Sequence, residues 1–546
     1  MSTIGKNLIR VLAVFVTVIT VMAGGNVLRA EAAGRTVSIE SCLINGDQVV
    51  CKLKASALPA SEDGLFYIYG NEVFQDGPSP NVVATITMGT EVTVNFPLQY
   101  NTTQSNLSRK FLVAVKQSGK MVQVSDEHYI TNPEVLAGFT STPIQAGIKG
   151  ILPSADITNG ELKELGIQQV VHNMPLDHLC SKEGAPGAVL FAYNGQNYYF
   201  DSAKLKAYDG TIKHFNNLGI KVTMVLLNMG TSEYTKHLIH PKAVGGNCPG
   251  YALNVEDAVA VNHLKAIAAF LGQRYSGKLG FGQVDNWILG NEVNARTSWW
   301  YTNSDSLDFN VGIYAKAFRI FYNELKGMNA NVRVYNSLDQ EWNRKSNPGS
   351  FLSKDYLDKF NYYMVREGNI DWGLSFHPYN SPLYDPYAWN GPAVWVKNNI
   401  TTPYITMQNI DILIDYMHKK EFLNPKGEVR SISLAEIGYT SSFGTEAQEA
   451  SVAYGYLKAR SLPDVDAFML FRQVDDEHEM KSYLAMGLKD LEGNKKPAYE
   501  IYKNLGTANE AVAKARASTI IGMDIDEMIN KKIIWTRQGD GVVQIP

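Results

Sequence analysis

Cysteine is scarce in this sequence, the charges nearly cancel, and no long hydrophobic run follows the first two dozen residues. The four cysteines form no cluster with histidine at zinc spacing, which argues against a zinc module. The 50 basic and 54 acidic residues leave a net charge of −4, so nothing favours nucleic acid or an anionic membrane as a partner. We therefore expect no metal, no cofactor and a neutral substrate.

The N-terminal residues have the pattern of an export signal. Two basic residues precede the apolar run 11–23, and an Ala-Glu-Ala triplet of small-x-small form ends at Ala32. The run is shorter than the ~20 residues that a membrane span needs, so we expect cleavage near Ala32, the alternative being an uncleaved anchor. The sequence thus predicts a signal peptide over residues 1–32 and a secreted, extracellular protein whose mature chain has no membrane span.

Four cysteines in an exported chain predict disulfide bonds. Cys42 and Cys51 flank a segment in which Gly46-Asp47 can turn a hairpin, and pairing symmetric about that turn places the two cysteines opposite each other. We expect a disulfide between them. Cys180 and Cys248 are either bridged to each other or two buried thiols, because the sequence does not fix connectivity.

Short alternating segments separated by turn residues fill residues 35–135. Strands of this length and spacing, with no helical period between them, predict a small all-β sandwich of immunoglobulin-like type. This domain either binds sugar or braces its neighbour. It contains no clear aromatic platform, so bracing is the favoured interpretation.

After Pro143 apolar strands alternate with longer amphipathic segments, as in parallel βα units. Eight units predict an α/β fold, a (β/α)8 TIM barrel over residues 140–505, rather than a doubly wound sheet, whose glycine-rich turn is missing after the first strand. The tail, residues 506–546, has one expected helix at 509–516 and no assigned role. The expected barrel strands are 145–151, 168–173, 221–227, 284–289, 332–336, 372–377, 431–436 and 466–471.

Polar side chains stand at the ends of these strands, where barrels of this kind place their functional groups. Two carboxylates, Glu292 after the fourth strand and Glu436 at the end of the seventh, are expected to face each other across the barrel mouth. Cleavage of a glycosidic bond needs such a pair, one group to protonate the leaving oxygen and one to attack the anomeric carbon or activate water. The other polar residues at strand ends are Asn173, Asn228, Asn291, His377, Tyr379, Arg472 and Gln473.

The Asn-Glu pair at 291–292, the His-Pro-Tyr at 377–379 and the segment SLAEIGYTS around Glu436 resemble a clan of retaining (β/α)8-barrel glycoside hydrolases. Enzymes of that clan carry the acid/base after strand four and the nucleophile after strand seven. The resemblance covers the barrel, and it implies that Glu292 is the acid/base and Glu436 the nucleophile.

The resemblance also implies roles for three neighbours of the pair. Asn291 would bind the sugar 2-hydroxyl, Tyr379 would hold Glu436 ionised by a hydrogen bond, and His377 would help to shape the subsite. The sequence departs from the clan after strand two, where His172-Asn173 replaces a common arginine, and after strand eight, where Phe471-Arg472-Gln473 replaces a common tryptophan.

Aromatic residues are frequent in the segments that follow strands four, five and six. Sugar rings lie flat on aromatic faces, so these side chains are candidate substrate platforms, the alternative being that they pack the long loops together. The candidates are Trp299, Trp300, Trp342 and Trp389.

Together these features predict a secreted retaining β-glycoside hydrolase that cleaves a neutral poly- or oligosaccharide by double displacement, or transfers its glycosyl unit. The expected partner is that saccharide, with the protein associated with a cell wall. One alternative is a non-catalytic carbohydrate-binding protein on a barrel scaffold, which the intact pair of glutamates argues against. Another is a metal-dependent barrel hydrolase, but strand one supplies none of the histidine and aspartate ligands that it needs.

Overall fold

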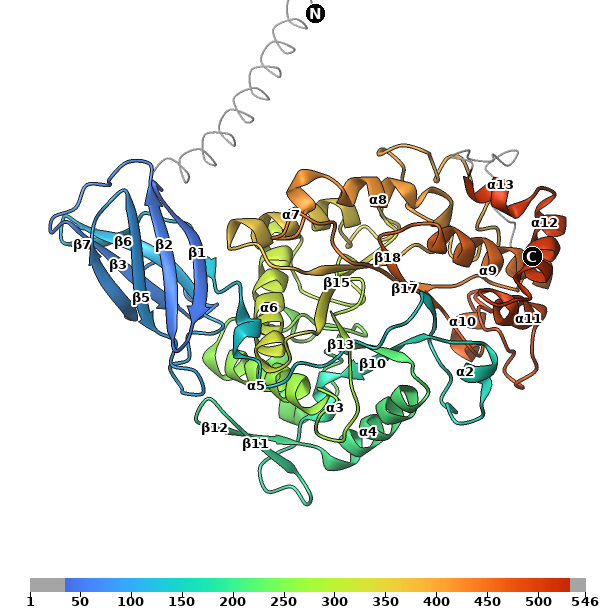
Figure 1. Ribbon diagram of the computed structural model, residues 1–546, viewed down its shortest axis with the longest axis horizontal. Coiled ribbons are helices and arrows are strands. Elements are labelled where there is room, and N and C mark those ends of the chain that lie inside the picture. Colours follow the sequence, from blue (N-terminus) through green and yellow to red (C-terminus); the bar gives the residue numbers. More distant parts are fainter. Residues whose placement is uncertain (1–34, 531–546) are drawn as a thin grey trace, which may run out of the picture. The chain divides into compact units, whose positions relative to one another are not determined.

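The computed structural model describes residues 35–530, which form two compact units (Figure 1). One unit is all-β and consists mainly of residues up to 131; the other contains the barrel and most of the later residues. The signal peptide predicted for residues 1–32 lies outside the described residues. Between residues 35 and 530, no helix is both long and apolar enough to cross a membrane.

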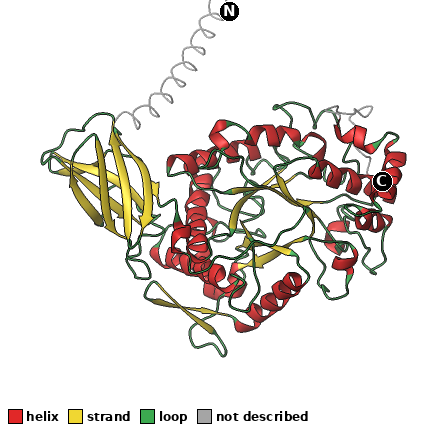
Figure 2. Ribbon diagram, viewed as in Figure 1, coloured by secondary structure: helices red, strands yellow, loops and turns green. Residues whose placement is uncertain are grey.

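The first unit is a sandwich of two antiparallel sheets, as predicted (Figure 2). Buried and exposed residues alternate along its strands, so each sheet turns one apolar face inward. The rings of Phe96 and Phe111, one from each sheet, lie 5.0 Å apart in the core. One sheet consists of β1 (Val37–Asn45), β2 (Gln48–Ala55) and β5 (Glu91–Pro97), and the other of β3 (Leu65–Asn71), β4 (Val82–Thr87), β6 (Lys110–Gln117), β7 (Lys120–Gln123) and β8 (His128–Tyr129).

The four cysteines are thiols in this structure. The β1–β2 register places Cys42 opposite Cys51, as the hairpin argument predicts, but their sulfur atoms lie 3.0 Å apart and form no covalent bond. Cys180 and Cys248 are not bonded to each other, and each thiol donates a hydrogen bond to a backbone carbonyl near it in the chain. The predicted disulfide is therefore not formed here, although its partners are in register.

The second unit is a closed barrel of eight parallel strands with helices outside it, which confirms the predicted fold (Figure 2). All eight expected strands are present, and the fifth runs three residues further than predicted, to Asp339. Around the barrel the strands are β9 (Lys149–Ile151), β10 (Gln169–Pro175), β13 (Lys221–Leu227), β14 (Asn286–Leu289), β15 (Arg333–Asp339), β16 (Gly373–His377), β17 (Ile432–Ile437) and β18 (Val465–Leu470).

Most strand residues of the barrel are buried, because one face lines the interior and the other contacts the helices. The interior is filled by inward side chains from six of the eight strands, so the barrel is a packed core and not a channel. Its members are Val171, Val225, Leu227, Ile288, Tyr335, Ala435, Ala467 and Met469.

Helices connect the strands, and an antiparallel hairpin of β11 (Val189–Tyr193) and β12 (Gln196–Phe200) precedes the first long helix. Gly166 and Gly219 have φ of +66° and +73° where two helices give way to strands, which is the left-handed conformation expected there. The helices of the barrel are α2 (Glu161–Glu164), α3 (Leu176–Leu179), α4 (Ser202–Asn217), α5 (Ala258–Arg274), α6 (Leu307–Met328), α7 (Ser353–Arg366), α8 (Asp411–Met417), α9 (Thr445–Arg460), α10 (Glu477–Met480) and α11 (Pro497–Asn504).

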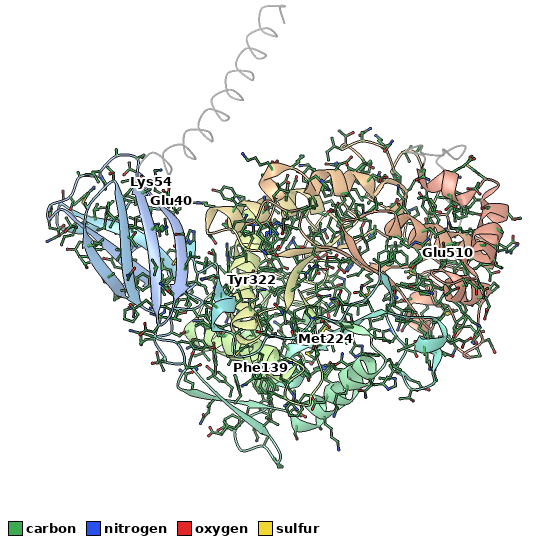
Figure 3. The ribbon with its side chains drawn as sticks, in the orientation of Figure 1. Glu40, Lys54, Phe139, Met224, Tyr322 and Glu510 are labelled. Atoms are coloured by element: carbon green, nitrogen blue, oxygen red, sulfur yellow. The ribbon has the colours of Figure 1, made fainter. Side chains whose placement is uncertain are left out.

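The described part of the tail forms two helices, α12 (Glu510–Ile521) and α13 (Ile525–Asn530), that belong to the barrel unit. Glu510, labelled in Figure 3, accepts hydrogen bonds from Arg460 of α9 at 2.5 and 2.7 Å. Arg516 of α12 pairs in turn with Glu449 of α9 at 3.0 Å. These ion pairs attach residues that the sequence left without a role to an outer helix of the barrel.

Two glycines provide a matched test of packing in the barrel. A Cβ on Gly373 of β16 meets the ring of Tyr335 at 2.3 Å, whereas a Cβ on Gly210 of helix α4 meets nothing within 4 Å. We expect Gly373→Ala to lower the free energy of unfolding by about 1 to 3 kcal/mol through overpacking. Gly210→Ala should raise it by about 0.5 to 1 kcal/mol, since alanine is the better helix former.

Denaturant unfolding followed by tryptophan fluorescence measures both changes in the barrel, because no tryptophan lies between residues 35 and 131. Equal effects of the two substitutions would contradict the packing described for β16.

Candidate active site

Glu292 stands on a tight turn directly after strand β14. Gly290 has φ +75°, and a Cβ there would meet Val293 at 2.7 Å, so the turn requires glycine. Glu292 itself has φ +38°, a conformation that costs a non-glycine residue on the order of 1 kcal/mol and that is frequent at functional sites. Its backbone amide donates to Ser337 Oγ at 3.0 Å, which holds the strained turn. The abrupt end of the apolar strand therefore places a carboxylate at the barrel mouth.

Glu436 comes from the end of β17, on another side of the same mouth. The hydroxyl of Tyr379, from the segment after β16, donates a 2.7 Å hydrogen bond to Glu436 Oε1. Tyr379 is only 4% exposed, so this hydrogen bond is shielded from competing water. The arrangement is the one that the clan resemblance implies for these two residues.

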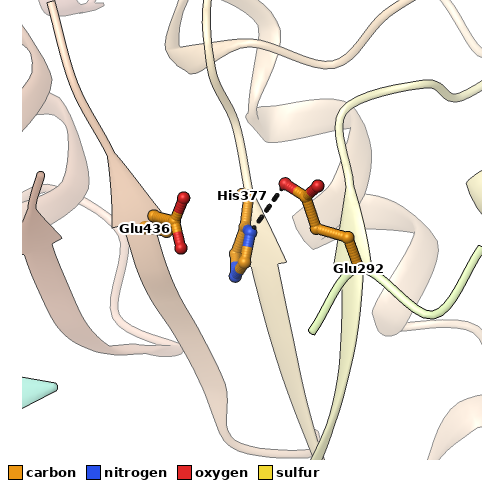
Figure 4. Close-up of side chains that lie close together, drawn as sticks. All are labelled: Glu292, His377 and Glu436. Atoms are coloured by element: carbon orange, nitrogen blue, oxygen red, sulfur yellow. Dashed lines mark hydrogen bonds and ion pairs between the residues drawn. The ribbon is translucent and has the colours of Figure 1, made fainter. Parts of the chain in front are cut away.

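His377, the last residue of β16, lies between the two glutamates (Figure 4). Its Nδ1 is 3.0 Å from Glu292 Oε1, so the ring and that carboxyl group are joined by a hydrogen bond. A ring nitrogen of His377 and one carboxylate oxygen from each of Glu292 and Glu436 all lie within 4.8 Å of one another. The two carboxyl groups thus approach each other closely across a neutral ring.

The two glutamates have different electrostatic environments. Burial and the charge of Glu341 raise the pKa of Glu292 to about 7, against a hydrogen bond from Trp299 that lowers it. Burial also raises the pKa of Glu436, and so does the charge of Glu292, whereas the hydrogen bond from Tyr379 acts to lower it. Burial lowers the pKa of His377, so the ring between them is neutral. At neutral pH one carboxyl group can hold a proton while the other is ionised.

Two further acids, Asp339 and Glu341, lie beside Glu292 and were not predicted. Asp339 Oδ1 accepts hydrogen bonds from Asn294 Nδ2 at 2.7 Å and from the Glu341 amide at 2.8 Å. Glu341 Oε1 accepts hydrogen bonds from the amide and hydroxyl of Ser346. Burial, followed by the charges of Glu292 and Glu341, raises the pKa of Asp339 well above its usual range. Asp339 was missed because strand five runs beyond its expected end, although the apolar Leu338 continues the strand pattern.

The acids open into a cavity of about 320 Å³, within the size range of small-ligand sites. Five of its lining residues carry carboxyl groups and none is lysine or arginine. The lining residues are Glu292, Ala295, Ser298, Asp339, Gln340, Glu341, Ser346, Asn347, Ser350, Tyr379, Leu383, Glu436, Phe471, Glu479, Leu484 and Met486.

The predicted amide side chains are placed away from this cavity. Asn228 Nδ2 donates to the Leu238 carbonyl at 3.2 Å, and Gln473 Nε2 donates to Glu161, so both amides support loops. The side chain of Asn173 is exposed and does not line the cavity. Asn291, next to Glu292 in the chain, is only 8% exposed and is also not part of the lining.

Three of the four candidate tryptophans are buried in the cores of the long loops. They stack edge to face on tyrosines, Trp300 on Tyr314, Trp342 on Tyr416 and Trp389 on Tyr387, at 5.0, 5.1 and 5.5 Å. Long loops need apolar cores of their own, and these rings supply them. Trp299 is the exception, because its side chain hydrogen-bonds Glu292.

Among the described residues, Glu292, His377 and Glu436 are the group whose spacing could hold a metal ion. Two of the three side chains are already joined, His377 Nδ1 to Glu292 Oε1, and Glu436 holds the Tyr379 hydroxyl. A metal would have to replace these hydrogen bonds. The contacts as they stand are those of an acid–base network.

The chain belongs to the family described as a family of unknown function (DUF5722), whose model matches residues 141–528. No match was found among curated proteins.

Solved structures similar to this chain include a family 39 glycoside hydrolase from Bacteroides cellulosilyticus, with TM-score 0.43 and 14% identity over 84% of this chain and 77% of that one. A glucosidase from Croceicoccus marinus has TM-score 0.41 and 13% identity over 67% and 69% of the two chains. A mutant of β-glucuronidase 2 from Bacteroides uniformis has TM-score 0.38 and 10% identity over 87% of this chain and 50% of that one. This chain thus spans about half the length of that β-glucuronidase.

The raised pKa of Glu292 provides a test of this site. Glu341→Gln removes a negative neighbour, so we expect the Glu292 pKa to fall below about 7. The Glu292 pKa is measured from infrared difference spectra of the carboxyl bands across a pH titration. The band that is missing in Glu292→Gln identifies the Glu292 carboxyl group. Glu477→Gln is the matched control, since Glu477 is 82% exposed and does not line the cavity. An unchanged Glu292 pKa in Glu341→Gln would show that burial alone sets it.

Proposed function

We propose that this member of the DUF5722 family is a retaining β-glycoside hydrolase, with Glu292 as acid/base and Glu436 as nucleophile. The observation that carries the proposal is the close approach of the two carboxyl groups, with oxygens within 4.8 Å. Retaining glycosidases hold their carboxyl groups about 5 to 5.5 Å apart, whereas inverting enzymes need about 6.5 to 9.5 Å to admit a water molecule. The short separation supports direct attack by a carboxylate on the sugar.

In the first step Glu436 attacks the anomeric carbon, and the bond to the leaving oxygen breaks as that oxygen takes the proton of Glu292. In the second step Glu292, now ionised, removes a proton from water. The resulting hydroxyl attacks the anomeric carbon and releases Glu436, so the overall configuration is retained. A sugar hydroxyl in place of water would give transglycosylation by the same residues.

The environment of each glutamate suits its role. Glu292 needs a proton at working pH, and a pKa of about 7 provides one. Glu436 must be ionised to attack, which the hydrogen bond from Tyr379 favours. The neutral ring of His377 holds Glu292 in position without supplying a positive charge that would lower its pKa.

The charge of the cavity supports a substrate without anionic groups. Five carboxyl groups and no lysine or arginine line it, and of the five only Glu479 is paired with an arginine among residues 35–530, Arg472 at 3.3 Å. A uronate, sulfate or phosphate would therefore meet repulsion. We propose a poly- or oligosaccharide whose unit bonded to Glu436 is neutral, in agreement with the charge balance of the sequence. A carbohydrate-binding protein without catalysis is the alternative, but it gives no reason for the strained backbone of Glu292 or for the unequal carboxyl groups.

We also propose export of the protein, with removal of residues 1–32, oxidation of Cys42 and Cys51 to a disulfide, and action at a cell wall. The register that sets the two thiols 3.0 Å apart supports the bond, since only a small side-chain movement is needed to form it. The intact mass of protein recovered from the culture medium tests this: it should match a chain beginning after Ala32 and missing two hydrogens. A full-length mass, or two alkylatable thiols at these positions, would refute it.

The proposed roles of the two glutamates can be separated with azide, using an aryl β-glycoside that the wild type hydrolyses. We expect Glu292→Ala and Glu436→Ala each to reduce kcat/KM by at least about 10²-fold. Azide should restore turnover in both variants with opposite products. In Glu436→Ala it attacks from the face left by the nucleophile and gives the α-glycosyl azide. In Glu292→Ala it attacks the glycosyl-enzyme and gives the β-glycosyl azide.

Glu477→Ala, which removes an exposed acid, should retain wild-type rates. Full activity in either active-site variant, or the same anomer from both, would refute these roles.

A further inference from the structure

Asp339 and Glu341 have no part in the two steps above, yet they lie in the same cavity. They are 5% and 6% exposed, so both are acidic side chains in positions where an unpaired negative charge is costly. Each is fixed by hydrogen bonds to one oxygen only, Asp339 through Oδ1 and Glu341 through Oε1. Each carboxyl group is thus buried and held in place through one oxygen, while its other oxygen has no hydrogen-bond partner among the described residues. This arrangement indicates a binding site.

The second oxygen of each group remains available to a ligand. Within residues 35–530 nothing donates a hydrogen bond to Asp339 Oδ2 or Glu341 Oε2, and neither atom is sealed off from the cavity. No lysine or arginine lines the cavity to neutralise these acids. A ligand that pairs with these two acids must therefore donate several N–H hydrogen bonds and carry a positive charge. An ammonium group has three such donors.

If Glu292 and Glu436 have the proposed roles, Asp339 and Glu341 lie on the side of the cavity where the leaving group binds. Strand β15, which carries Asp339, neighbours β14, which carries the turn of Glu292, whereas β17 with Glu436 lies two strands further on. Asn294, just after Glu292, donates to Asp339 Oδ1 at 2.7 Å. Glu341 is a charged neighbour of Glu292. A sugar unit that takes the proton of Glu292 as it leaves must approach this side.

We infer that Asp339 and Glu341 form a subsite for a protonated amino group, so that the unit released on cleavage is an amino sugar of glucosamine type. The unit that remains on Glu436 is neutral, and the amino group of the departing unit binds between the two free oxygens. A metal ion fits less well, because Asp339 and Glu341 do not belong to the metal-sized group found among the described residues. An N-acetylated unit would lose the positive charge and two of the donors.

Binding by the full-length protein tests the inference without turnover. Calorimetry at about pH 6, where the amine is protonated, uses a β-1,4-linked glucose oligomer with one glucosamine unit, placed at the end that is released. Binding of this glucosamine oligomer is compared with that of the N-acetylated counterpart and of the all-glucose oligomer of the same length. We expect the glucosamine oligomer to bind at least about tenfold more tightly than the other two, as charge-assisted hydrogen bonds imply.

Asp339→Asn and Glu341→Gln should each reduce this preference, and the double variant should abolish it while binding of the glucose oligomer changes less than threefold. Glu477→Gln, an equal change of charge outside the cavity, should keep the preference. Thermal unfolding checks that each variant is folded. If Asp339→Asn does not fold, the reduced preference expected in Glu341→Gln is the test.

The inference is overturned if the three oligomers bind equally, if none binds, or if the preference survives in the double variant. A preference for the glucosamine oligomer only in the presence of calcium would also overturn it, since the acids would then hold the metal. Failure of the catalytic roles is seen separately, as hydrolysis that survives in Glu292→Ala and Glu436→Ala, so the two claims can fail independently.

Discussion

The site is governed by the crowding of carboxyl groups in a cavity that contains no basic side chain. Acids that share a desolvated space cannot all be ionised, so their protons are distributed according to local hydrogen bonds. Glu436 receives the hydrogen bond of Tyr379, whereas Glu292 is opposed by the charge of Glu341. The roles that we propose for the pair, one acid and one nucleophile, depend on this asymmetry, and so does the affinity for a cation that we infer beside it.

The barrel makes this crowding possible. Eight parallel strands deliver their carboxyl ends to one mouth, so residues more than a hundred positions apart in the chain meet there. The packed interior gives the strands a rigid support, which is needed because repelling groups would otherwise move apart. The glycine turn before Glu292 and the ring of His377 between the glutamates hold the pair at short range. Stability elsewhere in the fold thus compensates for strain and repulsion at the mouth.

The sequence was sufficient to predict the architecture and the principal pair. Apolar strands and their alternation with helices are properties of single segments, so all eight barrel strands could be located, and Glu292 and Glu436 followed from their places at strand ends. The orientation of side chains at the strand ends and in the loops was harder to predict. Gln473 and Asn228 stand at strand ends but turn to support loops, and Trp342 packs into a loop core, because these outcomes depend on long segments with no repeating pattern. Asp339 was not predicted because the expected end of the fifth strand lay three residues before its actual end.

The most direct test of the central claim is a search for the covalent glycosyl-enzyme on Glu436. A 2-deoxy-2-fluoro glycoside with a good leaving group slows both steps, because fluorine destabilises the oxocarbenium-like transition state, and a reactive leaving group restores the first step alone. Peptide mass spectrometry after incubation should find the fluoro-sugar on the peptide containing Glu436, and no adduct in Glu436→Gln. An adduct on another residue, or turnover to a product of inverted configuration with no adduct, would contradict the account.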